Sequence, residues 1–283
     1  MAAPNQDWQA AVQHAARAAP DARILVIDIA SDKLLAAHHL AEAARTLAAP
    51  GSTLKPLVLY QLLNTSRWNA ERRIACDRRL VIAGHGLACS HPASAPFDAR
   101  EALAWSCNTY FAQVASEFAP GELGRLLRPT GLLGVTGMSA GHGASEAAAE
   151  FHEPNHAEAV QLALLGVDGI RVTPFELAAA YRWLAIEIAA HPDSVAARAV
   201  RAGLADSAKF GMASAASRGG VSVAGKTGTA EGAKTAQTHG WFAGFSPVDN
   251  SRVVVVVYLP SGRGADAARV AADLLMHAPG VRQ

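Results

Sequence analysis

Runs of apolar residues near both ends of the chain predict β-strands. The run VVVVVYL at residues 253–259 is apolar at every position, as in a strand that is buried on both faces. Residues 22–30 (ARILVIDIA) are rich in β-branched side chains and predict another strand. The polar letters SDK then predict a turn, and the stretch LLAAHHL returns as a further strand.

Apolar residues at helical spacing predict long helices in the rest of the chain. Residues 98–119 begin with Asp98, and Glu101 follows three residues later, as in a capping box. Thr173 is a predicted N-cap, with Pro174 at the first helical position. Further helices are predicted at 7–19, after Gly51, at 173–190 and at 264–277, whereas 76–96 and 135–155 are predicted to be irregular.

Short connections join three predicted strands near the C-terminal end and favour antiparallel pairing between them. These strands are VSVAGKTGTA, HGWFAGFSP and SRVVVVVYLP. We expect strands from both ends of the chain to share one sheet, with the helical middle inserted as a second lobe. Within a single domain of residues 1–283, we place the α/β lobe at about 1–55 and 190–283 and the helical lobe at about 56–189. A functional site would then lie in a cleft between the lobes.

Composition and charge exclude several classes of function. The 283 residues carry 25 basic and 24 acidic side chains, so nothing favours binding to nucleic acid or to an anionic membrane. No apolar run approaches the roughly 18 residues that span a bilayer. The first residues, MAAPNQDWQAAV, lack the basic and then apolar pattern of a signal peptide. We expect either a cytoplasmic protein or one whose export segment is missing from this version.

The three cysteines leave two interpretations open. Cys107 lies in a predicted buried helix and is expected to be a free core thiol. Cys76 and Cys89 flank a turn-rich stretch and could be free thiols as well. They could also form a disulfide, which would imply an oxidising compartment.

A serine and a lysine stand one turn apart at the start of the predicted helix after Gly51. Ser52 and Lys55 would therefore be neighbours on one helix face. A serine hydroxyl becomes an effective nucleophile when a base takes its proton. A lysine is such a base once burial or a nearby cation lowers its pKa. The alternative is a helix-capping serine beside a solvated lysine, and the pair alone is a weak signal.

The tripeptide SCN places two polar side chains in a predicted helix that is otherwise apolar. Ser106 could relay a proton between Lys55 and a leaving amine. Asn108 could bind a substrate amide or hold the lysine. For this tripeptide alone, a helix with two satisfied polar groups is the better explanation.

The motif KTGTA is predicted on a strand, where Gly228 indicates the close approach of a ligand or of another backbone. Lys226 and Thr227 could bind a carboxylate. The N–H of Thr229 could share an oxyanion hole with that of Ser52. The alternative is an edge strand whose lysine prevents aggregation. The letters GKT also occur in phosphate-binding loops. We expect the G-x-x-x-x-G-K pattern of that loop to be absent, with Gly220 one position too early, and a strand instead of a helix to follow.

Together and in this order, S-x-x-K, S-x-N and K-T-G are the signature of penicillin-binding proteins and serine β-lactamases. The chain resembles the transpeptidase domain of penicillin-binding proteins beyond these letters. Similar segments are APGSTLKPLVLY, AREALAWSCNTYFAQVA, DGIRVTPFELAAAYRWLA, VAGKTGTAE and HGWFAGFSP, and they span most of residues 22–260. Cys76 and Cys89 also resemble a pattern found in some members, which favours the disulfide.

The resemblance implies an α/β (α+β) fold in which a five-stranded antiparallel sheet lies between helices and an all-helical lobe is added. It implies that Ser52 is the acylated nucleophile, Lys55 its base and Ser106 the proton relay. Lys226 would support the proton network and help to bind the carboxylate. The other motif residues would bind the substrate: Asn108, Thr227, Gly228 and Thr229.

The substrate implied by the resemblance is a peptidoglycan stem peptide that ends in D-Ala-D-Ala. The terminal D-Ala would be released and the acyl group passed to an amine or to water. β-Lactam antibiotics would be covalent inhibitors, and no metal or organic cofactor is implied. The protein would work in the periplasm or another extracytoplasmic compartment, although the pedestal domain and membrane anchor of larger members are not in this chain.

Two other functions would use the same acylation chemistry. A β-lactamase must also deacylate quickly, and in class A enzymes the base is a glutamate after the second motif. Glu150 and Glu153 lie in a comparable region, but the local pattern differs. Asn108 also differs from the apolar residue in the S-x-V motif of class D enzymes. A β-lactam sensor domain would be acylated once without turnover, and the lack of a membrane segment argues against it.

Overall fold

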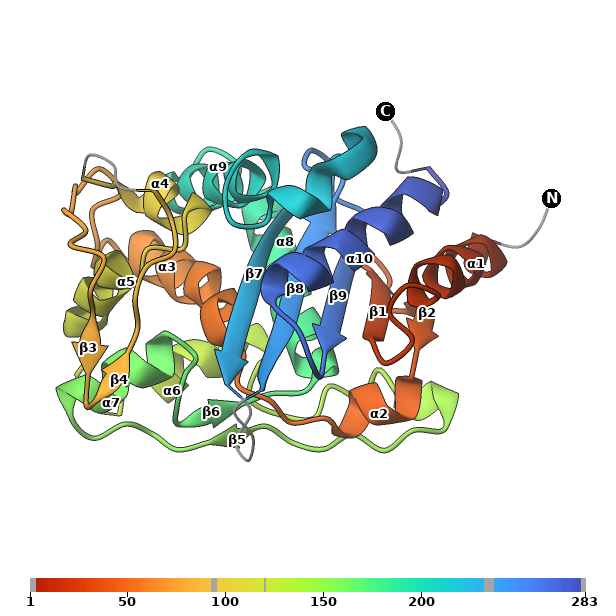
Figure 1. Cartoon of the computed structure of the whole chain (residues 1–283), viewed down its shortest axis with the longest axis horizontal. Helices are drawn as coiled ribbons and strands as arrows, with labels where there is room; N and C mark the ends of the chain where they lie inside the picture. The colour runs from red at the N-terminus through yellow and green to blue at the C-terminus, as the bar shows by residue number, and fades with distance from the viewer. Residues whose placement is uncertain (1–3, 93–95, 120, 232–236, 281–283) are drawn as a thin grey trace.

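The computed structural model describes residues 4–92, 96–119, 121–231 and 237–280. Its centre is a five-stranded antiparallel sheet with the strand order β2-β1-β9-β8-β7 (Figure 1). The strands are β1 (Arg23–Asp28), β2 (Leu34–His38), β7 (Ala224–Glu231), β8 (Thr238–Ser246) and β9 (Val253–Leu259). Ile24 lies opposite Val257, so strands from both ends of the chain share one sheet, as expected. This confirms the predicted fold class.

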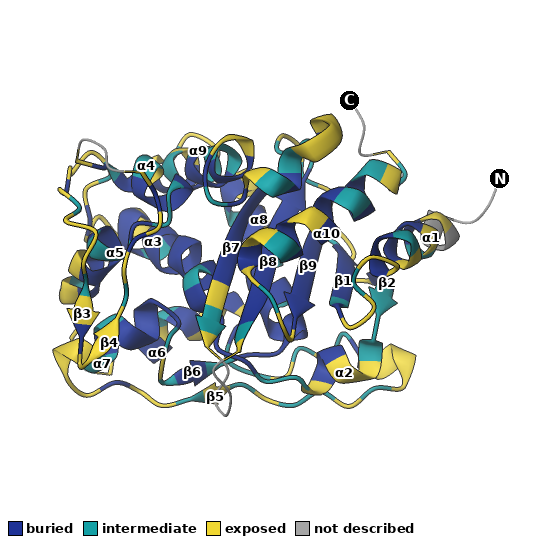
Figure 2. Cartoon of the chain, viewed as in Figure 1, coloured by how far each residue is buried: buried dark blue, intermediate teal, exposed yellow. Residues whose placement is uncertain are grey.

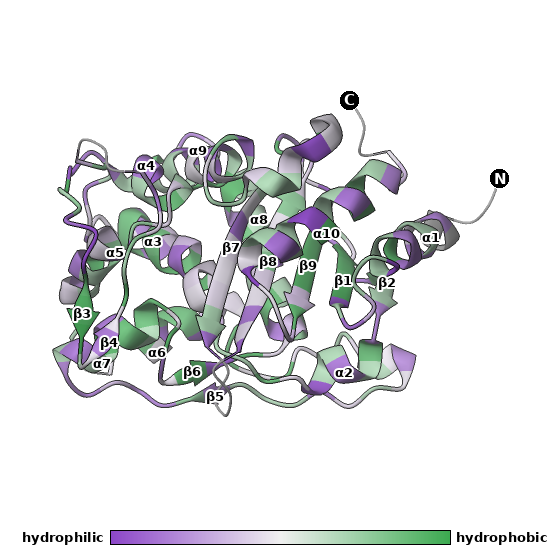
Figure 3. Ribbon diagram, in the orientation of Figure 1, coloured by the Kyte–Doolittle hydropathy of each residue, from purple (hydrophilic) through white to green (hydrophobic). Residues whose placement is uncertain are grey.

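Helices cover both faces of the sheet (Figure 1). Helices α1 (Pro4–Ala16) and α10 (Gly264–His277) pack on one face, and α8 (Pro174–Ala190) packs on the other. Alternate residues of β9 enter different cores: Val255 lies in the core beneath α10, whereas Val256 lies in the core beneath α8. Figure 2 shows β8 and β9 as buried, and Figure 3 shows β9 as strongly apolar. Burial on both faces explains why VVVVVYL has no polar position.

A group of short helices lies beyond the β7 edge of the sheet. Helix α9 (Val195–Lys209), which the sequence analysis did not predict, packs against α3, α4 and β7 and joins this group to the sheet. The other helices of the group are α3 (Lys55–Asn64), α4 (Ala99–Ala104), α5 (Asn108–Val114), α6 (Leu123–Leu127) and α7 (Ala157–Leu164). We propose that α8 belongs with the sheet lobe because it packs on the sheet, although the expected lobe boundary placed it among the helices.

The remaining elements are short. They are α2 (Leu40–Arg45), the two-stranded pair β3 (Val81–Ile82) and β4 (His85–Gly86), the pair β5 (Glu150–Phe151) and β6 (Ile170–Arg171), and the 3₁₀ turns η1 (Gly51–Leu54), η2 (Ala115–Glu117), η3 (Arg128–Thr130), η4 (Ala140–His142) and η5 (Ser214–Gly220). In the described part of the chain, none of the helices combines the length and apolar character needed to cross a bilayer.

Capping boxes start two of the predicted helices, the expected one at Asp98 and a further one at Thr173, where only an N-cap was predicted. The Asp98 side chain accepts the N–H of Glu101, and the Glu101 carboxylate accepts the N–H of Asp98. Thr173 and Glu176 form the same reciprocal pair at the start of α8. Each box satisfies two N–H groups that the first helical turn leaves unpaired.

Candidate active site

The turn η1 holds Ser52 and places it next to the third motif. Residues three apart in a 3₁₀ turn eclipse one another, so Ser52 and Lys55, at the start of α3, project on the same side. Gly51 has φ +55°, and a Cβ added there would lie 3.2 Å from both the N and the O of Thr229. The backbone that precedes Ser52 therefore lies directly against β7.

A break in the expected helix 98–119 positions the second motif. Helix α4 ends at Ala104, and α5 begins only at Asn108. Between them Ser106 adopts the left-handed conformation with φ +57°, which a continuous helix cannot contain. The prediction of one uninterrupted helix is therefore wrong, and the break directs Ser106 towards the two motif lysines.

The side chains of the three motifs meet at Ser106. The Lys55 amine donates to Asn108 Oδ1 (2.6 Å), to the Ser106 carbonyl (2.9 Å) and to Ser106 Oγ (3.3 Å). The Lys226 amine donates to Ser106 Oγ (2.8 Å) and to the Thr227 carbonyl (3.0 Å). One serine hydroxyl thus bridges two lysine amines that are far apart in the sequence.

Both lysines are fully buried, which weakens their hold on the ammonium proton. Burial lowers the pKa of Lys55 to about 8, against a smaller opposing effect of nearby cysteines. Burial, and then the charge of Lys55, lower the pKa of Lys226 well below its usual value. In the described part of the chain no carboxylate forms an ion pair with either lysine. Near neutral pH a part of the lysine side chains is therefore in the neutral amine form.

The other motif residues lie around this network with different contacts. Ser52 makes no side-chain hydrogen bond to a residue that the structure describes, and it is partly exposed. The Thr229 hydroxyl accepts the N–H of Gly264 at 2.9 Å. The Thr227 hydroxyl donates to the Met212 carbonyl at 3.4 Å. A Cβ at Gly228 would lie 2.5 Å from the Pro50 carbonyl oxygen, so a neighbouring backbone requires this glycine.

The structure does not contain the disulfide that the resemblance implied. The Sγ atoms of Cys76 and Cys89 are 3.5 Å apart, whereas a disulfide bond measures about 2.05 Å. Cys107 is a free and buried thiol, as expected, and it shares a cluster with the two other thiols and His91. The sequence analysis gave His91 no role. The spacing Cys-x-His at Cys89 and His91, downstream of Cys76, is a signal that could have indicated one.

The phosphate-loop alternative is removed by the structure rather than by the spacing of glycines. Gly220 and Gly225 do stand at the G-x-x-x-x-G-K-T spacing of that loop. Gly225 and Lys226 nevertheless lie within strand β7, and strand β8 is the next element after it. The Lys226 amine donates to Ser106 Oγ, whereas the lysine of a phosphate-binding loop lies beside a loop whose backbone N–H groups bind the phosphates.

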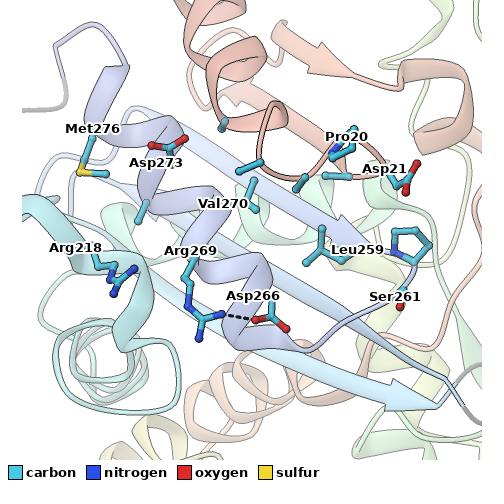
Figure 4. Close-up of a pocket in the computed structure, with 16 residues that line it drawn as sticks. Pro20, Asp21, Arg218, Leu259, Ser261, Asp266, Arg269, Val270, Asp273 and Met276 are labelled. Carbon is cyan, nitrogen blue, oxygen red and sulfur yellow. Dashed lines mark hydrogen bonds and ion pairs between the residues drawn. The ribbon is translucent and has the colours of Figure 1, made fainter.

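Two hollows in the described surface contain none of the motif side chains. One, of about 840 Å³, is lined in part by Ala48, Ala49 and His239 and borders the segment that leads to Ser52. The other, of about 600 Å³, lies between the end of α1, the end of β9 and α10 (Figure 4). Its walls include the ion pair of Asp266 with Arg269, and it contributes nothing to the site described above.

Comparisons with known proteins agree with this geometry. The family described as the penicillin binding protein transpeptidase domain matches residues 22–276. A search of curated proteins found no match. A peptidoglycan glycosyltransferase from Burkholderia ambifaria is 19% identical with a TM-score of 0.79, over 99% of this chain and 96% of that one.

Two further solved structures show the same fold. The transpeptidase domain of Burkholderia pseudomallei penicillin-binding protein 3 is 20% identical with a TM-score of 0.80, over 96% of this chain and 92% of that one. Pseudomonas aeruginosa PBP2, solved in complex with WCK 5153, is 18% identical with a TM-score of 0.78, over 97% of this chain and 78% of that one. The motifs, the fold and the match to the family over most of the sequence place this chain in the penicillin-binding protein transpeptidase domain family.

Proposed function

We propose that the chain is a serine-type DD-transpeptidase or DD-carboxypeptidase that acts on peptidoglycan stem peptides ending in D-Ala-D-Ala. One observation carries the proposal: the Ser106 hydroxyl bridges two fully buried lysine amines, and one of them belongs to Lys55, one turn after Ser52. A structural role alone would not require two cations to be desolvated together, because each costs free energy when buried. We place the reaction outside the cytoplasm, where peptidoglycan is cross-linked.

Acylation would begin with proton transfer from Ser52 to the neutral amine of Lys55. Ser52 Oγ then attacks the carbonyl carbon of the penultimate D-Ala, and the negative charge develops on the carbonyl oxygen. Backbone N–H groups of Ser52 and Thr229 would stabilise that oxygen, since the Gly51 backbone already lies against Thr229. No step requires a charged base, which suits a lysine whose pKa is lowered by burial.

Collapse of the tetrahedral intermediate breaks the peptide bond and releases D-Ala. The leaving nitrogen needs a proton, and Ser106 would supply it while taking one from Lys55. The acyl group, now an ester of Ser52, is then transferred to an amine of a second stem peptide or to water. The substrate would lie along β7, the edge strand of the sheet, as an added strand with its carboxylate near Lys226 and Thr227.

A β-lactamase function gains no support from the two glutamates considered above. Glu150 pairs with Arg171 at 3.6 Å. Glu153 accepts the N–H of Gly124 at 3.1 Å. Both carboxylates are therefore engaged with other groups, and a β-lactam ester of Ser52 would be long-lived. β-Lactams would act on this protein as covalent inhibitors.

The test is to incubate the protein with a penicillin and follow its intact mass. We expect an adduct of one drug molecule that persists, is absent in Ser52→Ala and is retained in Ser116→Ala, a control serine whose hydroxyl bonds only the local Gln113 carbonyl. A synthetic peptide ending in D-Ala-D-Ala should release D-Ala with the same dependence on Ser52. A short-lived adduct with hydrolysed drug would favour a β-lactamase, and no adduct would refute the proposal.

A further inference from the structure

Three cysteines and a histidine come together at the second motif, which contributes Cys107. The ligand atoms of Cys76, Cys89, His91 and Cys107 all lie within 4.8 Å of one another. Cys89, His91 and Cys107 are buried, and Cys76 is half-buried. The proposed acyl transfer makes no use of these four side chains.

The distances fit a tetrahedral metal site. Cys76 Sγ lies 3.5 Å from Cys89 Sγ and 3.5 Å from His91 Nε2. A tetrahedron with Zn–S bonds of about 2.3 Å and a Zn–N bond of about 2.0 Å has S–S edges of about 3.8 Å and S–N edges of about 3.5 Å. These two distances, with all four ligand atoms within 4.8 Å of one another, are compatible with one zinc ion bound among them.

The orientation of His91 is also that of a metal ligand. Its Nδ1 lies 2.8 Å from the Pro92 carbonyl, which can only accept a hydrogen bond, so Nδ1 carries the proton. In the neutral imidazole, Nε2 is then the nitrogen with a free lone pair, and it lies 3.5 Å from Cys76 Sγ. In most metal-binding histidines one ring nitrogen binds the metal, and the other donates its N–H to a carboxylate, a backbone carbonyl or water.

The surrounding backbone is ordered as around a bound thiolate. The Asn108 N–H donates to Cys89 Sγ at 3.1 Å, and the Cys89 N–H donates to the Arg78 carbonyl at 3.1 Å. The second bond closes a hairpin that brings Cys76 and Cys89 together from its two sides. Cys107 comes from a different part of the chain, the turn between α4 and α5.

We propose that Cys76, Cys89, His91 and Cys107 bind one Zn²⁺ ion that fastens the 76–91 hairpin to the second motif. Three thiolates and one imidazole form a closed tetrahedral set of the kind that structural zinc sites use. Binding displaces the thiol protons, which are released to solvent as the Zn–S bonds form. This departs from the expectation that no metal is needed, which rested on the family resemblance alone.

The position of Cys107 gives the metal a second effect. Cys107 stands between Ser106 and Asn108, both of which bond the Lys55 amine, and Asn108 Nδ2 also donates to the Leu87 carbonyl of the same hairpin at 3.1 Å. Zinc would thus hold the turn that orients Lys55. The four ligands are positioning residues for the acylation of Ser52 and touch no substrate.

The metal site is tested on the whole chain, purified without chelator. We expect one zinc per chain by elemental analysis and native mass spectrometry. Co²⁺ added to the zinc-free protein should give the intense visible bands and the sulfur-to-metal charge-transfer absorption of a tetrahedral thiolate site. His91→Gln should weaken zinc binding by more than about 100-fold, the upper end of what loss of a supporting partner costs. His85→Gln, in an exposed position on β4, should bind zinc normally.

The outcomes separate the metal site from the proposed function. Removal of zinc should slow the acylation of Ser52 by penicillin at least about 10-fold, and re-addition should restore it. Zinc binding without any acylation would uphold the metal site and reject the proposed function. A protein that binds no zinc even when zinc is supplied, with the three thiols free or with Cys76 and Cys89 oxidised to a disulfide, would overturn the metal site. The cobalt spectrum of the unaltered chain tests the metal site without relying on the folding of His91→Gln.

Discussion

The contact between Asn108 and Lys55 predicts how one added charge would shift the pH dependence of acylation. Asn108 Oδ1 accepts a hydrogen bond from the Lys55 amine at 2.6 Å, and no carboxylate in the described part of the chain pairs with this lysine. Asn108→Asp changes one side-chain nitrogen to oxygen and adds a negative charge at that position. A carboxylate so close to an amine stabilises the ammonium form.

The magnitude follows from the pKa of Lys55. With a pKa of about 8, roughly one tenth of the Lys55 side chains are neutral at about pH 7. An adjacent carboxylate raises the pKa by about 1 to 3 units, so the neutral fraction at that pH falls about 10- to 1000-fold. Because the base must be neutral, acylation rises with pH up to the pKa and is constant above it. The midpoint should move from about 8 to between about 9 and 11.

The assay is the second-order rate constant for acylation by a fluorescent penicillin, measured from about pH 6 to about pH 11. Asn108→Ala is the control, because it removes the same acceptor without adding a charge. Its rates should fall without a move of the midpoint to higher pH. If the profile of Asn108→Asp superposes on that of the unaltered protein after scaling, Lys55 is not the base that limits acylation.

The other predictions concern stability. Gly166 has φ +68°, and a Cβ there would lie 2.3 Å from the Gly51 carbonyl oxygen, so Gly166→Ala should lower the free energy of unfolding by about 2–4 kcal/mol and also slow acylation. Gly137→Ala is the control, because Gly137 has φ +79° and open space around it, so only the backbone strain lowers its stability. If both variants lose the same free energy of unfolding in urea, the contact with Gly51 does not matter. Tyr110→Phe removes the acceptor of the buried Trp68 indole N–H, a bond of 2.7 Å, and should cost about 1–3 kcal/mol by the same measurement. No loss of stability would mean that solvent satisfies the indole.

The parts of the fold that were predicted well are those that local sequence determines. Helix α10 begins and ends where its pattern predicted, and the capping pairs at Asp98 and Thr173 start their helices. The run of valines marked β9 because burial on both faces leaves no room for polar residues. The three motifs were recognised from the sequence alone, and the structure brings Lys55 and Lys226 within hydrogen-bond distance of Ser106.

The features that were missed depend on contacts between distant segments. Nothing in AWSCNTYF shows that Ser106 leaves the helix, because its left-handed conformation is held by bonds from two lysines elsewhere in the chain. The grouping of Cys107 with Cys76 requires the hairpin to fold onto that same break. Helix α9 is rich in alanine, and alanine marks the apolar face of a helix only weakly.

The sheet order also determines when the protein can fold as it is synthesised. Strand β1 lies between β2, its immediate neighbour in sequence, and β9, which is synthesised long after both of them. Until then one edge of β1 has no partner, although Leu25 and Val26 are fully buried in the finished protein. A nascent or truncated chain that stops before Val253 would present an apolar strand edge to other chains. Cellular quality control must therefore protect β1 until β9 has been synthesised.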